Sequence, residues 1–111
     1  MGIIKSFDYP VAKSQAKYRE VKQPNKVVLS PNKRYTLVID YPLNKTYRGT
    51  VVSGKSGVTL KQLLDKIVAH YYKIYKSPSK YQIWGHAITD LAIESMNINH
   101  GRGIITLSVG S

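Results

Sequence analysis

The sequence contains no cysteine and few acidic residues, and each shortage excludes a class of chemistry. Without cysteine the chain forms no disulfide, binds no metal through thiolates and has no cysteine nucleophile. Only six aspartates and glutamates occur in 111 residues, which argues against a mechanism built on paired carboxylates. We therefore expect a protein that is not an enzyme, with no catalytic residues, no metal site and no cofactor.

Long apolar runs are also missing. No stretch approaches the ~20 apolar residues that a membrane-spanning helix requires, so we expect no membrane partner. Phenylalanine occurs once and tyrosine nine times. Because tyrosine has an apolar ring and a polar hydroxyl, this bias favours half-buried positions and interfaces over a dry core.

Positive charge is what the sequence has in excess. Seventeen lysines and arginines against six acidic residues give a formal net charge of +11. Residues 1–34 contain eight basic and two acidic residues, residues 35–76 seven and two, and residues 77–111 two and two. The charge is therefore concentrated in the first two thirds of the chain, which predicts a one-sided basic surface and an acidic partner.

The hydrophobic pattern divides the chain into two parts. Residues 1–33 are polar, basic and interrupted by three prolines, which predicts a basic extended arm, with a short strand over 26–29. Residues 34–111 predict a single α+β domain, in which strands over 34–41 and 46–53 precede a helix and strands over 91–99 and 104–109 follow it. This order, β-β-α-β-β, predicts an antiparallel sheet of about four strands packed by one long helix.

The helix is the element with the clearest signals. Thr59 and Gln62 have the spacing of a capping box, and Ser77-Pro78 ends the helical pattern. Leucine, isoleucine, valine and tyrosine recur at three- and four-residue spacing from Leu60 to Tyr75 and predict the buried face. We expect Lys61, Lys66, Lys73 and Lys76 to share the exposed face.

The segment from Gly49 to Ser56 matches the phosphate-binding pattern G-x-x-x-x-G-K-[ST]. Its spacer, Thr-Val-Val-Ser, favours a strand, and the helix begins several residues after Lys55. A phosphate loop needs a flexible spacer and a helix that starts at the lysine, so we interpret the segment as a strand-to-helix connection. Contact of Lys55 and the loop amides with a nucleic-acid phosphate remains an alternative.

Two further groups of residues receive structural interpretations. His86 and Asp90 are four residues apart, but no third ligand is spaced to complete a metal site, so we expect them to satisfy each other or nearby backbone groups. Trp84, Ile88, Leu91 and Ile93 are expected to be buried together.

The last strand ends in Gly110-Ser111, and if it lies at the sheet edge its open backbone groups favour a homodimer.

The basic residues form the candidate site. Lysines that each neutralise a phosphate, with tyrosines between them, are typical of nucleic-acid binding. Lysine predominates over arginine, which favours backbone contacts with little sequence preference. We take double-stranded DNA as the favoured partner, although lysine contacts to phosphate fit DNA and RNA alike. The predicted contacts are Lys13, Lys17, Arg19, Lys22, Lys26, Arg48, Lys55, Lys61, Lys66, Lys73 and Lys76. The alternatives are a structural or interaction protein that binds an acidic protein partner, and lysines that only keep the protein soluble.

Three stretches in the C-terminal half carry a resemblance. They are 59–67, 81–94 with the pattern W-G-H-x-I-x-D-L from Trp84 to Leu91, and 105–111 ending in L-S-V-G-S. These stretches resemble small basic proteins of amoeba-infecting giant DNA viruses of the Marseillevirus type. The resemblance implies a virion DNA-binding protein, homodimeric, present in the virion and in the cytoplasm or nucleus of the infected cell. It brings no catalytic residues with it.

Overall fold

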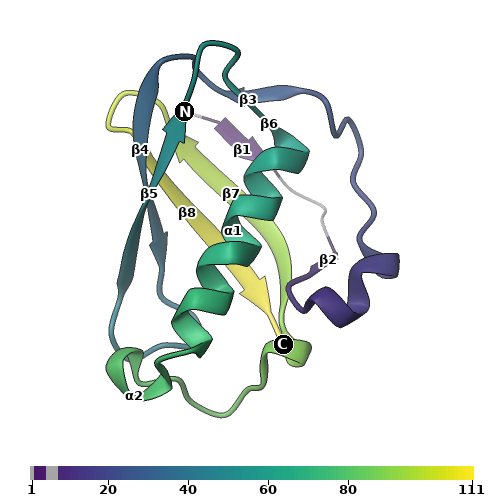
Figure 1. Cartoon of the computed structure of the whole chain (residues 1–111), viewed down its shortest axis with the longest axis vertical. Coiled ribbons are helices and arrows are strands. Elements are labelled where there is room, and N and C mark those ends of the chain that lie inside the picture. Colours follow the sequence, from purple (N-terminus) through teal and green to yellow (C-terminus); the bar gives the residue numbers. More distant parts are fainter. Residues whose placement is uncertain (1, 5–7) are drawn as a thin grey trace.

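A computed structural model describes residues 2–4 and 8–111 of the chain, in which one long helix crosses one face of a sheet (Figure 1). The elements, in chain order, are β1 (Gly2–Ile4), β2 (Tyr9–Pro10), the 3₁₀ helix η1 (Lys13–Tyr18), β3 (Val27–Leu29), β4 (Lys33–Ile39), β5 (Tyr47–Ser53), β6 (Val58–Thr59), α1 (Leu60–Tyr75), α2 (Pro78–Tyr81), the 3₁₀ helix η2 (Ile88–Asp90), β7 (Ala92–Asn99) and β8 (Ile104–Gly110). The α+β class predicted from the sequence is confirmed.

The main sheet differs from the predicted one in size and in direction. It has six strands, in the order β1-β7-β8-β4-β5 with β2 also on β7, and β3 and β6 form a separate pair. The hairpins β4–β5 and β7–β8 are antiparallel, but β4 and β8 run parallel, so the sheet is mixed. The chain between the hairpins contains α1, and a helical crossover of this length is what parallel pairing requires.

The position of β8 corrects the expectation that the last strand lies at the sheet edge. β8 lies between β7 and β4: it pairs with β7 along its length and with β4 over Ile104–Thr106. At one end of the sheet β1 and β2 pair with β7, and at the other end β5 pairs with β4 alone. Among the described residues, the short strands β1 and β2 therefore form one edge of the main sheet, and the seven-residue strand β5 forms the other.

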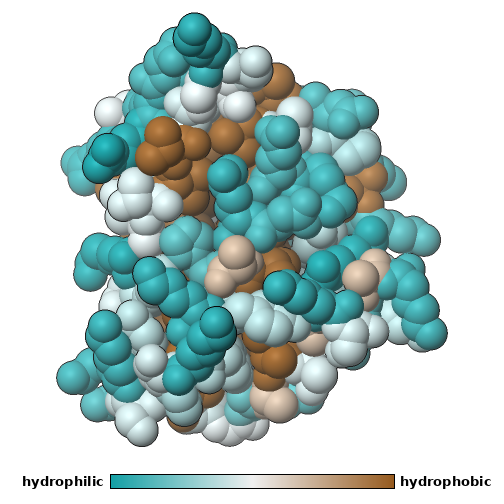
Figure 2. Space-filling model, viewed as in Figure 1, coloured by the Kyte–Doolittle hydropathy of each residue, from teal (hydrophilic) through white to brown (hydrophobic). Residues whose placement is uncertain are grey.

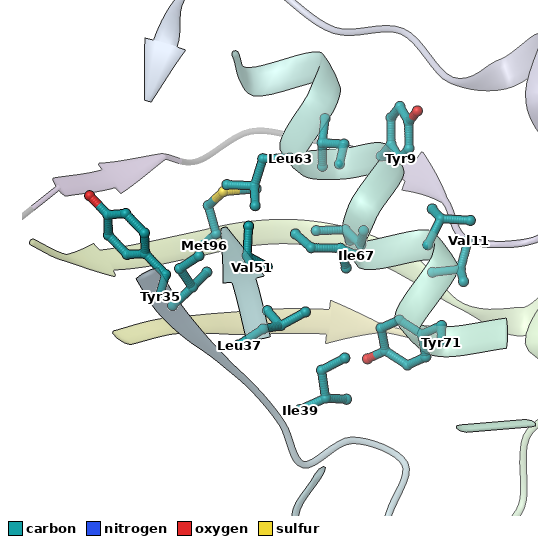
Figure 3. Close-up of a cluster of buried hydrophobic side chains, with 14 of the residues drawn as sticks. Tyr9, Val11, Tyr35, Leu37, Ile39, Val51, Leu63, Ile67, Tyr71 and Met96 are labelled. Carbon is teal, nitrogen blue, oxygen red and sulfur yellow. The ribbon is translucent and has the colours of Figure 1, made fainter. Parts of the chain in front are cut away.

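Helix α1 forms where the sequence predicts it and for the predicted reason. Thr59 is the N-cap, its hydroxyl accepts from the Gln62 amide at 3.2 Å, and the Gln62 side chain accepts from the Thr59 amide at 2.9 Å. The apolar face is buried, from Leu60 to Ile74. Figure 3 shows Leu63, Ile67 and Tyr71 of this face above Leu37 and Ile39 of the sheet.

The N-terminal segment is built into the core, contrary to our expectation that it contributes few core residues. Tyr9 and Val11 are fully buried beside α1 (Figure 3), and Leu29 is fully buried on β3. At the start of α1, the Leu60 backbone amide donates to the Lys26 carbonyl of this segment at 2.8 Å. Alternation of apolar residues is weak here because each short strand adds only one or two side chains to the core.

The expectation of a buried Trp84 is wrong, although Leu91 and Ile93 are buried as predicted. The Trp84 side chain is 45% exposed and packs edge-on against the Tyr41 ring, with ring centroids 5.6 Å apart. The Trp84 amide donates to the Pro42 carbonyl at 3.0 Å, which holds the backbone near β4 while the indole faces outward.

Each histidine is paired with a tyrosine. His100 lies 3.0 Å from the Tyr35 hydroxyl, His86 3.1 Å from that of Tyr41, and His70 2.6 Å from that of Tyr47. Of the two arrangements expected for His86 and Asp90, Asp90 adopts the second: its carboxylate accepts from the nearby Ala87 backbone amide at 2.9 Å.

Candidate nucleic-acid interface

The eleven predicted contact residues are placed on several surfaces. Ten are exposed, and Arg19 is half-buried. Figure 2 looks onto the α1 side of the molecule and shows hydrophilic side chains over most of this face. The structure divides the eleven into a main group of five lysines on η1, on the segment after it and at the end of α1, two cations next to this group that have internal partners, two lysines beside β5, and two residues at other places.

The main group is a basic strip that joins the N-terminal segment to α1. The Lys13 ammonium lies over the Tyr72 ring, 4.7 Å from its centroid, and the Lys13 amide donates to the Tyr72 hydroxyl at 2.5 Å. Further along η1, the Lys17 ammonium lies 4.9 Å from the centroid of Tyr18, whose side chain is 60% exposed. We define the η1–α1 surface by its exposed side chains and the tyrosines between them: Lys13, Lys17, Tyr18, Lys22, Lys26, Tyr72 and Lys76.

A hollow continues this surface toward the start of α1. Tyr18, Lys22 and Lys26 line it together with Leu60 and with two acidic residues, Asp8 and Glu20. At the other end, Lys76 follows Tyr72 by one helical turn. The η1–α1 surface therefore carries five lysines with two tyrosines among them, the combination that can contact phosphates and stack on bases.

Arg19 and Lys61 have structural duties beside this surface. The Arg19 guanidinium donates to the carbonyls of Pro10 and Val11, at 2.8 Å and 2.6 Å. The Lys61 ammonium contacts Asp65 at 2.8 Å and donates to the Tyr9 hydroxyl at 3.2 Å. The hydrogen bond to Asp65, followed by the one to Tyr9, raises the pKa of Lys61. These two cations are therefore less available to a ligand than the lysines of the η1–α1 surface.

Lys66 and Lys73 lie on the other side of α1. Lys66 follows Lys61 by five positions, so their side chains point about 140° apart around the helix axis. Lys66 and Lys73 point within about 20° of each other. Both line a hollow with Thr50 and Val52 of β5. The four lysines predicted to share one face therefore lie on two sides of the helix: Lys61 and Lys76 on the side of η1, and Lys66 and Lys73 on the side of β5.

His70 lies on the β5 side of the helix. Partial burial lowers its pKa, and the nearby charges of Lys73 and Lys66 act in the same direction, against an opposing hydrogen bond with the Thr50 backbone. A neutral imidazole is favoured there.

Arg48 and Lys55 are separated from both of these sides of the helix. Arg48 is exposed on β5 between Tyr47 and Gly49, whose sides face the helix, so it belongs to the sheet face opposite α1. Lys55 lies in the loop between β5 and β6. The spacer of the phosphate-loop pattern is a strand, as predicted, because β5 continues to Ser53.

Sequence reasoning missed three cations that the topology brings near Lys55. Lys33 pairs with Ser53 across the β4–β5 ladder, and Arg34 follows it. The turn that contains Arg102 reaches the same end of β4, since the Lys33 ammonium donates to the His100 carbonyl. The β4–β5 hairpin brings Lys33 and Arg34 toward Lys55, and the parallel β4–β8 pairing, which no spacing in the sequence indicates, adds the turn with Arg102.

Few of these charges are neutralised internally. Within residues 2–4 and 8–111, the Lys61–Asp65 contact is the one ion pair that forms. No group of three or more His, Asp or Glu side chains in the described part of the chain is placed to hold a metal ion. Nor is any described helix long and apolar enough to cross a membrane.

Comparison with family models, with curated proteins and with solved structures found no match to this chain. The comparisons therefore assign no family, and the resemblance to giant-virus proteins stays a prediction.

Proposed function

We propose that this protein binds nucleic acid without catalysis and largely independently of sequence, with duplex DNA as the favoured ligand. The observation that carries the proposal is the excess of uncompensated cations: seventeen basic residues face six acidic ones, and a single ion pair forms among the described residues. Self-repulsion of this kind destabilises a compact domain, and a polyanion relieves it.

The η1–α1 surface is the proposed principal contact. Its five cations are all lysines, which act as point charges and lack the planar fork with which arginine reads guanine. Lys13 and Lys17 each lie over a tyrosine ring, so the cations and rings are presented together. This chemistry supports phosphate contacts with added stacking, and it supports little discrimination between base sequences.

The test is the affinity for two unrelated duplexes, measured by fluorescence anisotropy over a series of salt concentrations. We expect similar affinities for both, with log K falling linearly against log salt by about 0.9 for each phosphate contact. Absence of binding at ~50 mM salt, where screening is weak, contradicts the proposal. A strong preference for one duplex contradicts its sequence tolerance.

The homodimer, the virion location and the role in an infected cell stay predictions that derive from the resemblance. The structural argument for the dimer no longer holds, because β8 is a central strand. The edge strand β5 is treated below.

A further inference from the structure

The outer edge of β5 has backbone groups that face away from the sheet. The Thr36 amide of β4 donates to Gly103 at 2.7 Å, on the β8 side, so the Thr36–Thr50 pair is one of the pairs that exchange no hydrogen bond between β4 and β5. The amide and carbonyl of Thr50 therefore point away from β4. The hydrogen bond from His70 already uses the carbonyl, so the Thr50 amide is the group that stays open to a new strand. The same alternation turns the amides and carbonyls of Arg48 and Val52 outward.

A groove runs between this edge and the outer surface of α1. Two adjoining hollows share Val52, Lys66 and Ala69, and they continue one another along the strand. Because the Ala69 side chain is small, it leaves the groove unfilled on the α1 side. Val52 is 59% exposed at the rim.

The charge of the groove is positive. Lys66 and Lys73 line it from α1, and Asp65 at its side contacts Lys61 instead. His70 fills part of the wall and hydrogen-bonds with the Thr50 backbone. The groove therefore combines main-chain hydrogen-bonding groups, an exposed valine and two lysines.

We propose that the β5–α1 groove binds an acidic, extended peptide segment of a partner protein, which adds to the sheet as a strand beside β5. In such an addition the main chain supplies affinity and alternate side chains supply specificity. The side chains directed toward α1 would be acidic, opposite Lys66 and Lys73. Those directed toward the opposite sheet face would be β-branched, beside Val52.

Charge decides between this occupant and a second copy of the chain. Antiparallel pairing of β5 with itself would bring Lys66, Lys73 and Arg48 of one copy toward the same residues of the other. With a net charge of +11 on each copy, like charges would meet across the new pair. An acidic strand meets the same groups with opposite charge.

The probe is an acetylated, amidated peptide of alternating valine and glutamate, titrated into ¹⁵N-labelled protein, with a valine–lysine peptide as control. We expect amide shifts concentrated on β5 and on the outer side of α1, and no binding of the lysine peptide. Shifts concentrated elsewhere, or equal binding of both peptides, would overturn the proposal.

Two variants at one position test the strand addition itself. Thr50→Pro removes an outward amide without removing a bond to β4, a place where an edge strand accepts proline, and Thr50→Val keeps the amide. We expect the proline variant to bind the valine–glutamate peptide at least roughly tenfold more weakly than the valine variant. Equal binding by the two would refute strand addition.

A third variant changes two side chains of the groove and leaves the β5 backbone unchanged. It tests the groove independently of the proposed nucleic-acid binding. Lys66→Ala/Lys73→Ala should weaken the peptide about tenfold at low salt, and circular dichroism checks that each variant is folded. Undiminished peptide binding, or a mass showing that the protein is a dimer that Thr50→Pro dissociates, would overturn the proposal. Failure of duplex binding leaves the peptide result unaffected, because the groove does not depend on the η1–α1 surface.

Discussion

Replacing Leu29 by alanine tests whether the N-terminal segment belongs to the folded core. Leu29 is fully buried on β3, which pairs with β6 at the entrance to α1. Val27 lies two residues away on the same strand but is 52% exposed, so Val27→Ala is a matched control. Both substitutions shorten an aliphatic side chain within one strand, and burial is the main difference between them.

The expected loss follows from that burial. Leu29→Ala removes three carbons, at about 0.8 kcal/mol each, so about 2.4 kcal/mol of transfer free energy is lost. A residual cavity adds to this loss, and buried leucine-to-alanine changes cost about 2–5 kcal/mol in all. The exposed Val27→Ala should stay within about 0.5 kcal/mol of wild type. A domain of this kind has a total stability of about 5–15 kcal/mol, so the effect is large.

Urea unfolding followed by far-UV circular dichroism measures both variants. We expect the midpoint to fall strongly for Leu29→Ala and hardly at all for Val27→Ala, with unchanged slopes. A change below about 1 kcal/mol for Leu29→Ala would refute the reasoning and restore the segment as a peripheral arm. Deletion of residues 1–33 should accordingly unfold the protein.

Four further results are expected. Thr59→Ala should cost about 1 kcal/mol in the same urea assay, because the hydroxyl caps the Gln62 amide, and an unchanged midpoint would dismiss the cap. Gly49→Ala should cost about 1–3 kcal/mol, because its Cβ would lie 2.6 Å from Cε1 of His70, and full stability would contradict this packing. The lowered pKa of His70 means that the unfolded chain binds more protons just below pH 6.5, so stability should fall as the pH drops there, and His70→Gln should reduce that fall. Light scattering at micromolar concentration should report a dimer if the resemblance holds, and a monomer would end that prediction.

The sequence predicts those parts of the fold that depend on neighbours along the chain. The capping box at Thr59 and the apolar stripe of α1 act within a few residues, so their spacing is visible. The two hairpins likewise join adjacent segments. The parallel pairing of β4 with β8 joins residues such as Leu37 and Ile105, and no local pattern specifies which strand becomes central.

The sequence predicts which basic residues are candidates for the site, but it does not predict how they are grouped in space. Helical periodicity shows that the three lysines of α1 and the C-cap Lys76 are exposed. Only the neighbours of the helix decide that Lys66 borders β5 while Lys61 is held by Asp65. Arg19 looks like a phosphate contact in a basic segment, yet its guanidinium satisfies two backbone carbonyls. Trp84 was assigned to the core by its size, although a loop carries it to the surface.

The most direct test of the central claim compares the salt dependence of duplex binding for two variants of equal charge. Lys17→Ala/Lys22→Ala removes two lysines from the η1–α1 surface, and Lys66→Ala/Lys73→Ala removes two from the β5 side of α1. For random duplex DNA we predict that the first variant flattens the slope of log K against log salt by about two units, whereas the second keeps a slope close to wild type. Equal slopes for the Lys17→Ala/Lys22→Ala variant and the wild type would contradict the account.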